Sequence, residues 1–150
     1  MGNGILGTNT VVQVGIVVKD IEKTGRKYAE FLGMDLPALK VTATVDKTMA
    51  EFKGRPMSGR TKQMIFRLEN IEIELLEPDE GESTWREFLD SSGEGVHHIA
   101  FRIKDMKEKA GLLEKDGIAL VQKGEYIGGR YAYMDSIQDL KVMIELLEND

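Results

Sequence analysis

Four polar residues of this chain have the types and the spacing that could hold one divalent metal ion. They are Gln13, Glu74, His98 and Glu145. One imidazole, two carboxylates and one amide oxygen suit Zn, Ni, Co, Mn or Fe(II), whereas no soft ligand is present to select copper. Two carboxylates also balance the charge of a divalent cation. Such a centre could bind two adjacent substrate oxygens and stabilise the negative charge that forms when a carbon next to a carbonyl loses its proton.

An internal repeat places these four residues at equivalent positions. The string Ile-Glu-Leu-Leu-Glu occurs at residues 73–77 and again at residues 144–148, and each copy closes a segment that opens with an apolar stretch and an aspartate. Gln13 and His98 each lie seven residues before that aspartate. His98 follows Gln13 by 85 residues and Glu145 follows Glu74 by 71, so the first module is longer by the difference, 14 residues. We expect the excess in the basic loop 53–62 and its flanks.

The pattern of apolar, glycine and capping residues predicts two modules with the order strand, helix, then strands. Asp20 is expected to begin the first long helix and Gly33 to end it, and Asp105 and Gly117 do the same in the second module. Thr84, with Glu87 three residues later, predicts a short helix between the modules. Strands are expected over residues 11–19, 39–44, 49–52, 63–68, 71–77, 96–103, 119–122, 130–135 and 141–147.

These elements predict an α+β fold in which two βαβββ modules share one sheet. The first module spans residues 11–78, a connector with the short helix spans 79–95, and the second module spans 96–148. At 150 residues the chain is long enough for one compact domain that folds without disulfides, and it contains no cysteine. The sequence therefore favours a single domain built by duplication.

Strand alternation predicts that the four candidate ligands point to the same face of the sheet. Neighbouring side chains along a strand point to opposite faces, and the apolar residues of each strand oppose the candidate ligands. His97 shares the side of the apolar residues, so we expect it to be a core histidine that faces away from the centre. A lone glutamate on a strand is usually only solvated, but four polar residues at duplicated positions favour a metal site over that alternative.

Charge and composition exclude some classes of binding partner. The net charge of −6 and the pI near 5.1 argue against a nucleic-acid groove. No apolar run approaches the roughly 18 residues that a membrane span requires. We therefore expect a cytoplasmic protein that acts on a small molecule and has neither a nucleic-acid nor a membrane partner.

Residues 73–78, 85–89 and 93–101 together resemble methylmalonyl-CoA epimerases, and residues 11–147 are similar to the vicinal oxygen chelate superfamily. That superfamily includes glyoxalase I, methylmalonyl-CoA epimerase, extradiol dioxygenases and bleomycin-resistance proteins. The resemblance implies a cupped mixed sheet with helices outside and one metal ligand from each of four strands. The matching positions are Gln13, Glu74, His98 and Glu145. Epimerases usually have histidine where this chain has Gln13, and a Gln-Glu-His-Glu set resembles some glyoxalase I enzymes instead.

The resemblance also implies an activity. We expect a metal-dependent isomerase or lyase that transfers a proton next to a chelated carbonyl, with Glu145 as the catalytic base and Glu74 as the alternative. The substrate would be a small carbonyl compound or a thioester, and two copies would form a homodimer. A non-catalytic, resistance-type binding protein and a purely structural dimer are the other functions that the fold permits.

Four further residues are weaker candidates for contact with a substrate. Arg60 lies in the basic loop 53–62, which could hold an anionic tail but is more simply a solvated surface loop. Arg130, Tyr131 and Tyr133 could line the mouth of the pocket, although aromatic strand residues more often only pack.

Overall fold

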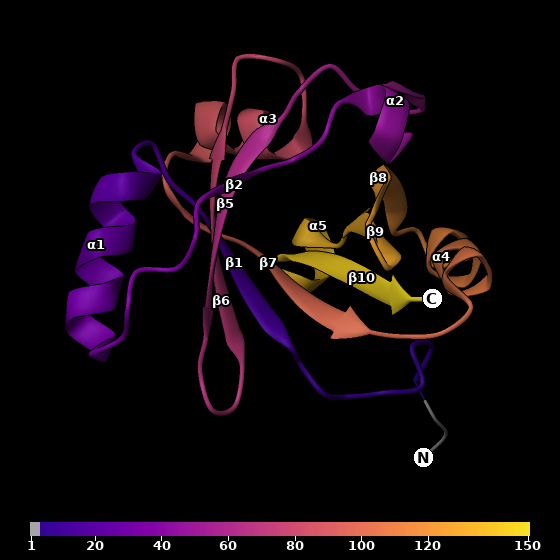
Figure 1. Cartoon of the computed structure of the whole chain (residues 1–150). Helices are drawn as coiled ribbons and strands as arrows, with labels where there is room; N and C mark the ends of the chain where they lie inside the picture. Colours follow the sequence, from indigo (N-terminus) through magenta and orange to yellow (C-terminus); the bar gives the residue numbers. More distant parts are fainter. Residues whose placement is uncertain (1–3) are drawn as a thin grey trace.

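A computed structural model describes residues 4–150. In this part of the chain ten strands form one mixed, curled sheet, and five helices accompany it (Figure 1). No helix within residues 4–150 is both long and apolar enough to cross a membrane. In chain order the elements are β1 Gln13–Val17, α1 Ile21–Leu32, β2 Lys40–Val41, α2 Val45–Thr48, β3 Glu51–Phe52, β4 Arg55–Pro56, β5 Thr61–Arg67, β6 Glu72–Pro78, α3 Thr84–Ser92, β7 Gly95–Arg102, α4 Met106–Lys115, β8 Ala119–Tyr126, β9 Gly129–Asp135, α5 Ile137–Leu140 and β10 Met143–Asn149.

The sheet has the internal symmetry that the repeat predicts. Its strand order is β2-β5-β6-β1-β7-β10-β9-β8-β3-β4. β1 pairs in parallel with β6, and β7 pairs in parallel with β10. β1 and β7 pair antiparallel to each other, so the two halves meet along these first strands within one chain. The predicted fold of two βαβββ modules in one cupped mixed sheet is confirmed.

Three apolar clusters explain why the sheet curls with its long helices outside. One cluster packs α1 against residues such as Val18, Phe66 and Leu75, and a second packs α4 against residues such as Ile144 and Leu146. The third lies on the opposite, concave face. It consists of Val17, Ala50, Phe52, Met57, Leu76, Trp85, Leu89, Tyr133 and Met143. The side chains of β1, β6 and β10 therefore point alternately toward the helices and into the cup.

The ends of α1 follow the sequence, whereas those of α3 and α4 differ: Asp105 precedes α4 without a side-chain capping hydrogen bond, and the C-cap of α4 is Asp116 rather than the predicted Gly117. The Asp20 side chain accepts a hydrogen bond from the backbone N–H of Lys23 at the start of α1, and Gly33 ends this helix with φ 66°. The N-cap of α3, however, is Ser83, which accepts from the backbone N–H of Arg86, and not the predicted Thr84. Both residues have the required hydroxyl, so composition alone could not choose between them.

The extra residues of the first module form a crossover that the sequence did not place. We expected residues 49–52 to be a strand of the first module and 53–62 to be a loop. Instead β3 and β4 form a short hairpin, and β3 pairs with β8 of the second module through Glu51–Lys123 and Phe52–Gln122. In Figure 1 this part of the chain runs from β2 across to α2 beside β8. The hairpin therefore bridges the two halves, and its residues Ala50, Phe52 and Met57 pack into the cup.

Candidate metal centre

The four predicted ligands come from the four adjacent strands at the seam of the sheet. Gln13 lies on β1 and His98 on β7, while Glu74 lies on β6 and Glu145 on β10. The backbone register is symmetric about the seam. Gly15 pairs with both His98 and Glu74, and Ala100, the equivalent residue of β7, pairs with both Gln13 and Glu145. One pair of polar side chains per half thus converges at the same level of the cup.

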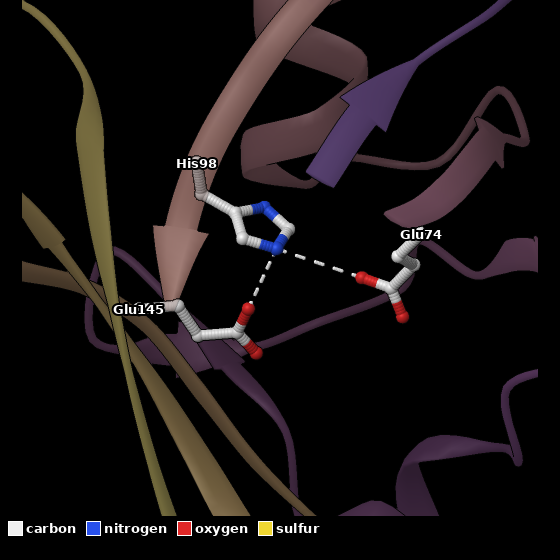
Figure 2. Close-up of side chains that lie close together, drawn as sticks. All are labelled: Glu74, His98 and Glu145. Carbon is white, nitrogen blue, oxygen red and sulfur yellow. Dashed lines mark ion pairs between the residues drawn. The ribbon is translucent and has the colours of Figure 1, made fainter. Parts of the chain in front are cut away.

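The side chains of Glu74, His98 and Glu145 point toward one another (Figure 2). Nε2 of His98 lies 2.7 Å from Oε2 of Glu145 and 3.5 Å from Oε1 of Glu74. One ligand atom from each of the three residues lies within 4.8 Å of the others. Oε1 of Gln13 lies 3.1 Å from the same imidazole nitrogen, and the Gln13 amide is oriented by a hydrogen bond from its Nε2 to Glu72. Three oxygens therefore surround one imidazole nitrogen.

Burial sets the charges of this cluster. His98 is 0% exposed, and the two glutamates and Gln13 are no more than 6% exposed. Burial raises the pKa of Glu145 to about 8, opposed by the hydroxyl of Tyr133. The pKa of Glu74 is well above its ordinary value of 4.5 because of burial and the nearby carboxylates of Glu145 and Glu72. Burial lowers the pKa of His98 to about 3, so the imidazole is neutral and offers no positive charge to the glutamates.

The cluster fits a cation because one of its oxygens has no partner. Oε2 of Glu145 is buried without a hydrogen bond, although it lies 2.7 Å from Nε2 of His98. A buried carboxylate oxygen without a partner is costly, and two neighbouring carboxylates repel each other when both are charged. A divalent ion would satisfy both. The donor set suits the borderline metals named from the sequence.

A close approach between Gly15 and His98 holds the imidazole in place. A Cβ atom built on Gly15 would lie 1.9 Å from Cε1 of His98, which is far inside van der Waals contact. The ring therefore lies directly against the backbone of β1. This contact could not be predicted from the sequence, because Gly15 has no side chain to mark it and is remote in sequence from His98.

The prediction that His97 faces away from the centre is wrong, although it is buried as expected. The partner of β1 shifts from His98 opposite Gly15 to Val96 opposite Ile16, which leaves His97 as the extra residue of a β-bulge. The bulge breaks the alternation. As a result, Nδ1 of His97 lies 2.9 Å from Nδ1 of His98, and Nε2 of His97 lies 3.1 Å from the hydroxyl of Thr84.

Aromatic side chains enclose the centre on the inner side of the cup. Tyr133 is 2% exposed, and its ring centroid lies 5.1 Å from that of His98. Its hydroxyl accepts a hydrogen bond from Nε1 of Trp85 at 3.1 Å. Tyr131 packs against both aromatic rings and accepts a hydrogen bond from Nε2 of Gln122. Of these residues, the sequence singled out the two tyrosines but gave no reason to include Trp85 or Gln122.

The two arginines proposed from the sequence are not brought to the centre. The Arg60 guanidinium donates two hydrogen bonds to the backbone carbonyl of Thr42. Arg130 forms an ion pair with Glu148 at 3.1 Å and another with Asp150. Since Arg130 alternates with Tyr131 along β9, it belongs to the other face of the sheet. A substrate contact for either arginine stays a prediction.

Comparison with known proteins identifies the family to which the chain belongs. Residues 12–133 match the family described as the glyoxalase/bleomycin resistance protein/dioxygenase superfamily. The chain belongs to this superfamily. Among curated proteins, the uncharacterized protein YqjC of Bacillus subtilis is 24% identical over 143 residues, which cover 93% of this chain and 92% of YqjC.

Solved structures of the superfamily share the fold. A methylmalonyl-CoA epimerase from Mycobacterium tuberculosis superimposes with a TM-score of 0.65 at 23% identity, covering 100% of this chain and 93% of the epimerase. A methylmalonyl-CoA epimerase in complex with methylmalonyl-CoA and NH4+ has a TM-score of 0.62 at 20% identity, covering 93% of this chain and 94% of that one. At these identities the likeness shows a common fold.

Proposed function

We propose that this superfamily member is a metal-dependent isomerase or lyase that transfers a proton on the carbon next to a substrate carbonyl. The observation that carries the proposal is the buried group of two glutamates and one neutral histidine around an unpartnered carboxylate oxygen. Gln13, Glu74, His98 and Glu145 would hold the ion. A bound divalent cation would withdraw electrons from the carbonyl oxygen and make the neighbouring C–H bond more acidic.

The chain's own residues supply the proton transfer. A carboxylate oxygen takes the proton from the α-carbon, the electron pair of that C–H bond forms a double bond to the carbonyl carbon, and the π pair of the carbonyl moves onto its oxygen. Returning the proton to the opposite face of the same carbon gives an epimer, and returning it to the adjacent carbon gives an isomer. We propose Glu145 as the base because its Oε2 has no hydrogen-bond partner, with Glu74 as the alternative.

A CoA thioester is our first candidate substrate, and a carbonyl compound joined to a thiol is the second. The thioester is supported by the similar fold of an epimerase that carries methylmalonyl-CoA. The apolar lining of the cup, with Trp85, Phe52 and Met57, would accept a short acyl group. The basic loop is a weaker candidate for binding an anionic tail of the substrate, because Lys53, Arg55 and Lys62 each form an ion pair with a glutamate.

A binding protein without chemistry is the alternative that the same fold allows. Such a protein has no need of two carboxylates and a histidine in a dry interior, where unpaired charge is costly. The polar cluster therefore favours the enzyme.

The test combines metal loading with hydrogen exchange. The wild-type protein, loaded separately with Zn²⁺, Ni²⁺, Co²⁺, Mn²⁺ and Fe²⁺, should bind about one ion per chain. In D2O it should exchange the α-proton of methylmalonyl-CoA or isomerise the adduct of methylglyoxal with a thiol, as followed by NMR. Glu145→Gln should lower turnover by about 10²- to 10⁴-fold, the usual contribution of a general base.

Glu125→Gln is the matched control, since this exposed glutamate of β8 lies outside the centre and its replacement should leave turnover unchanged. Undiminished turnover in Glu145→Gln would overturn the assignment of the base. A wild-type protein that takes up no ion under any loading condition would overturn the metal-dependent function itself.

A further inference from the structure

A chain of hydrogen bonds connects the candidate metal ligand His98 to the start of α3. Nδ1 of His98 lies 2.9 Å from Nδ1 of His97, and Nε2 of His97 lies 3.1 Å from Oγ1 of Thr84. The two histidines and Thr84 are at most 4% exposed, so water does not compete for these contacts. Two neutral imidazoles that share an Nδ1–Nδ1 contact must have one donor and one acceptor. The tautomers of His97 and His98 are therefore linked.

The geometry around His98 favours one pair of tautomers in the metal-free protein. The Gln13 amide donates through its Nε2 to Glu72, which turns its Oε1 toward Nε2 of His98 at 3.1 Å. An amide oxygen can only accept, so this contact favours the tautomer of His98 with its proton on Nε2, directed to Gln13 rather than to Oε2 of Glu145. Nδ1 of His98 then accepts from Nδ1–H of His97. Nε2 of His97 accepts in turn from the hydroxyl of Thr84.

With a metal ion held by Nε2 of His98, every donor in this chain would be reversed. A ligating nitrogen cannot carry a proton, so His98 would carry its proton on Nδ1 and donate to His97. His97 would then carry its proton on Nε2 and donate to Thr84, whose hydroxyl would accept. The three side chains neither gain nor lose a proton overall, and only the positions of their protons change.

We propose that His97 is a positioning residue that sets the tautomer of His98, donating to it without metal and accepting from it when metal is bound. This inference rests on the proposed metal centre. It gives a role to a buried histidine that is not itself a candidate ligand. The edge-to-face packing of the His97 ring against Phe88 and Tyr133 holds it in position for this contact.

Three variants separate this role from simple packing. His97→Phe keeps an aromatic ring in the same packing but removes both nitrogens, so zinc should bind about 10- to 100-fold more weakly, the usual effect of losing such a partner. His97→Asn keeps an oxygen acceptor near the position of Nδ1 and should recover most of the affinity. Thr84→Val removes the far end of the chain and should cause a smaller loss. Zinc affinity is measured by competition with a chelator, and circular dichroism and thermal unfolding confirm that each variant is folded.

The tautomers can be observed directly because the chain has two histidines and therefore four imidazole nitrogens. In ¹⁵N-labelled protein, the proton of His98 should lie on Nε2 without metal and on Nδ1 after zinc is added, with the opposite exchange in His97. An unchanged zinc affinity in His97→Phe, or a proton that stays on one nitrogen throughout, would overturn this inference and leave the proposed function standing. A wild-type protein that binds no zinc would overturn both.

Discussion

At the scale of single residues, the candidate centre depends on a missing side chain as much as on the four polar ones. Gly15 and Ala100 occupy equivalent positions of the two central strands. Ala100 lies opposite Gln13, whose side chain is flexible, whereas Gly15 lies opposite the rigid ring of His98. The space next to the ring is so small that a methyl group on Gly15 would overlap it.

Gly15→Ala should therefore disturb His98 without changing any polar group. The added methyl group must displace the imidazole from its present place, since its Cβ would lie 1.9 Å from Cε1 of the ring. We expect a loss of about 1–3 kcal/mol in the free energy of unfolding, as is usual for overpacking, together with weaker metal binding. Urea denaturation and metal titration measure the two effects.

Gly111→Ala in α4 is the control, because nothing lies within 4 Å of its added Cβ. Alanine is favoured over glycine inside a helix, so this variant should be unchanged or up to about 1 kcal/mol more stable. If Gly15→Ala behaved like Gly111→Ala, the proposed contact between Gly15 and His98 would be refuted.

The positions of single residues could be predicted from the sequence where regular rules applied. The repeat and strand alternation were enough to place the four polar residues in one cluster. They failed for His97, because a β-bulge adds one residue and reverses the alternation at that point. Nothing in the local sequence marks this bulge, which depends on how β1 and β7 pair across the seam.

At the scale of elements, the β3–β4 hairpin packs over the inner cluster and is held to the second half of the sheet by only a short pairing. Its pairing with β8 involves two residues on each strand, and its ion pairs Lys53–Glu87 and Glu51–Lys123 are exposed. Exposed ion pairs contribute little stability, about 0–1 kcal/mol each. Since the centre is buried beneath the inner cluster to which Phe52 belongs, we expect this hairpin to open when a substrate enters.

A disulfide between β3 and β8 should prevent that opening. Glu51 and Lys123 are directly paired, and antiparallel partners have Cα atoms at a separation that a disulfide can span. The chain contains no cysteine, so Glu51→Cys with Lys123→Cys creates a single possible bridge. Under oxidising conditions we expect turnover to fall by about tenfold or more, because substrate could not enter the closed cup, while metal content stays the same. A reductant should restore turnover.

The single variant Glu51→Cys is the control for this experiment, because it loses the same ion pair but cannot form the bridge within one chain. Equal turnover of the oxidised and reduced double variant would show that substrate enters by another route.

Element boundaries could be predicted only where the signal was local. The caps Asp20 and Gly33 defined α1, because the residues that end a helix lie next to it in sequence. β3 and β4 have two residues each, too few for a detectable alternation. The pairing of β3 with β8 joins residues about 70 positions apart in the chain, a distance over which local patterns carry no information.

At the scale of the whole molecule, the two halves meet where the candidate ligands are, so the stability of the fold and the charge of the centre are linked. The glutamates of the centre have raised pKa values and the histidines have lowered ones, in each case because burial disfavours the charged form. Without metal, the folded protein therefore keeps protons on its buried carboxyl groups at pH values where the unfolded chain has released them.

The stability of the metal-free protein should consequently fall as the pH rises from 6.5 to 8. Unfolded glutamates lose their protons near 4.5, whereas Glu145 in the folded protein loses its proton near 8. Folding thus binds protons in this range, and the free energy of unfolding should fall by up to about 1.4 kcal/mol per pH unit for each proton retained. His97 and His98 oppose this fall only near pH 6.5, where about half of the imidazoles of the unfolded chain still carry a proton, and they add little at higher pH. Urea denaturation at pH 6.5 and 8 in the presence of a chelator measures the difference.

A bound metal ion should reverse this dependence. The ion requires ionised carboxylates, so its stabilising effect should grow with pH, and proton release should accompany binding. The variant Glu74→Gln/Glu145→Gln has no carboxyl group left to titrate at the centre and should show neither the fall without metal nor the gain with it. If the metal-free wild-type protein were as stable at pH 8 as at pH 6.5, the two glutamates would already be charged in the folded state. The buried cluster would then have to be more open to water than its 5–6% exposure indicates.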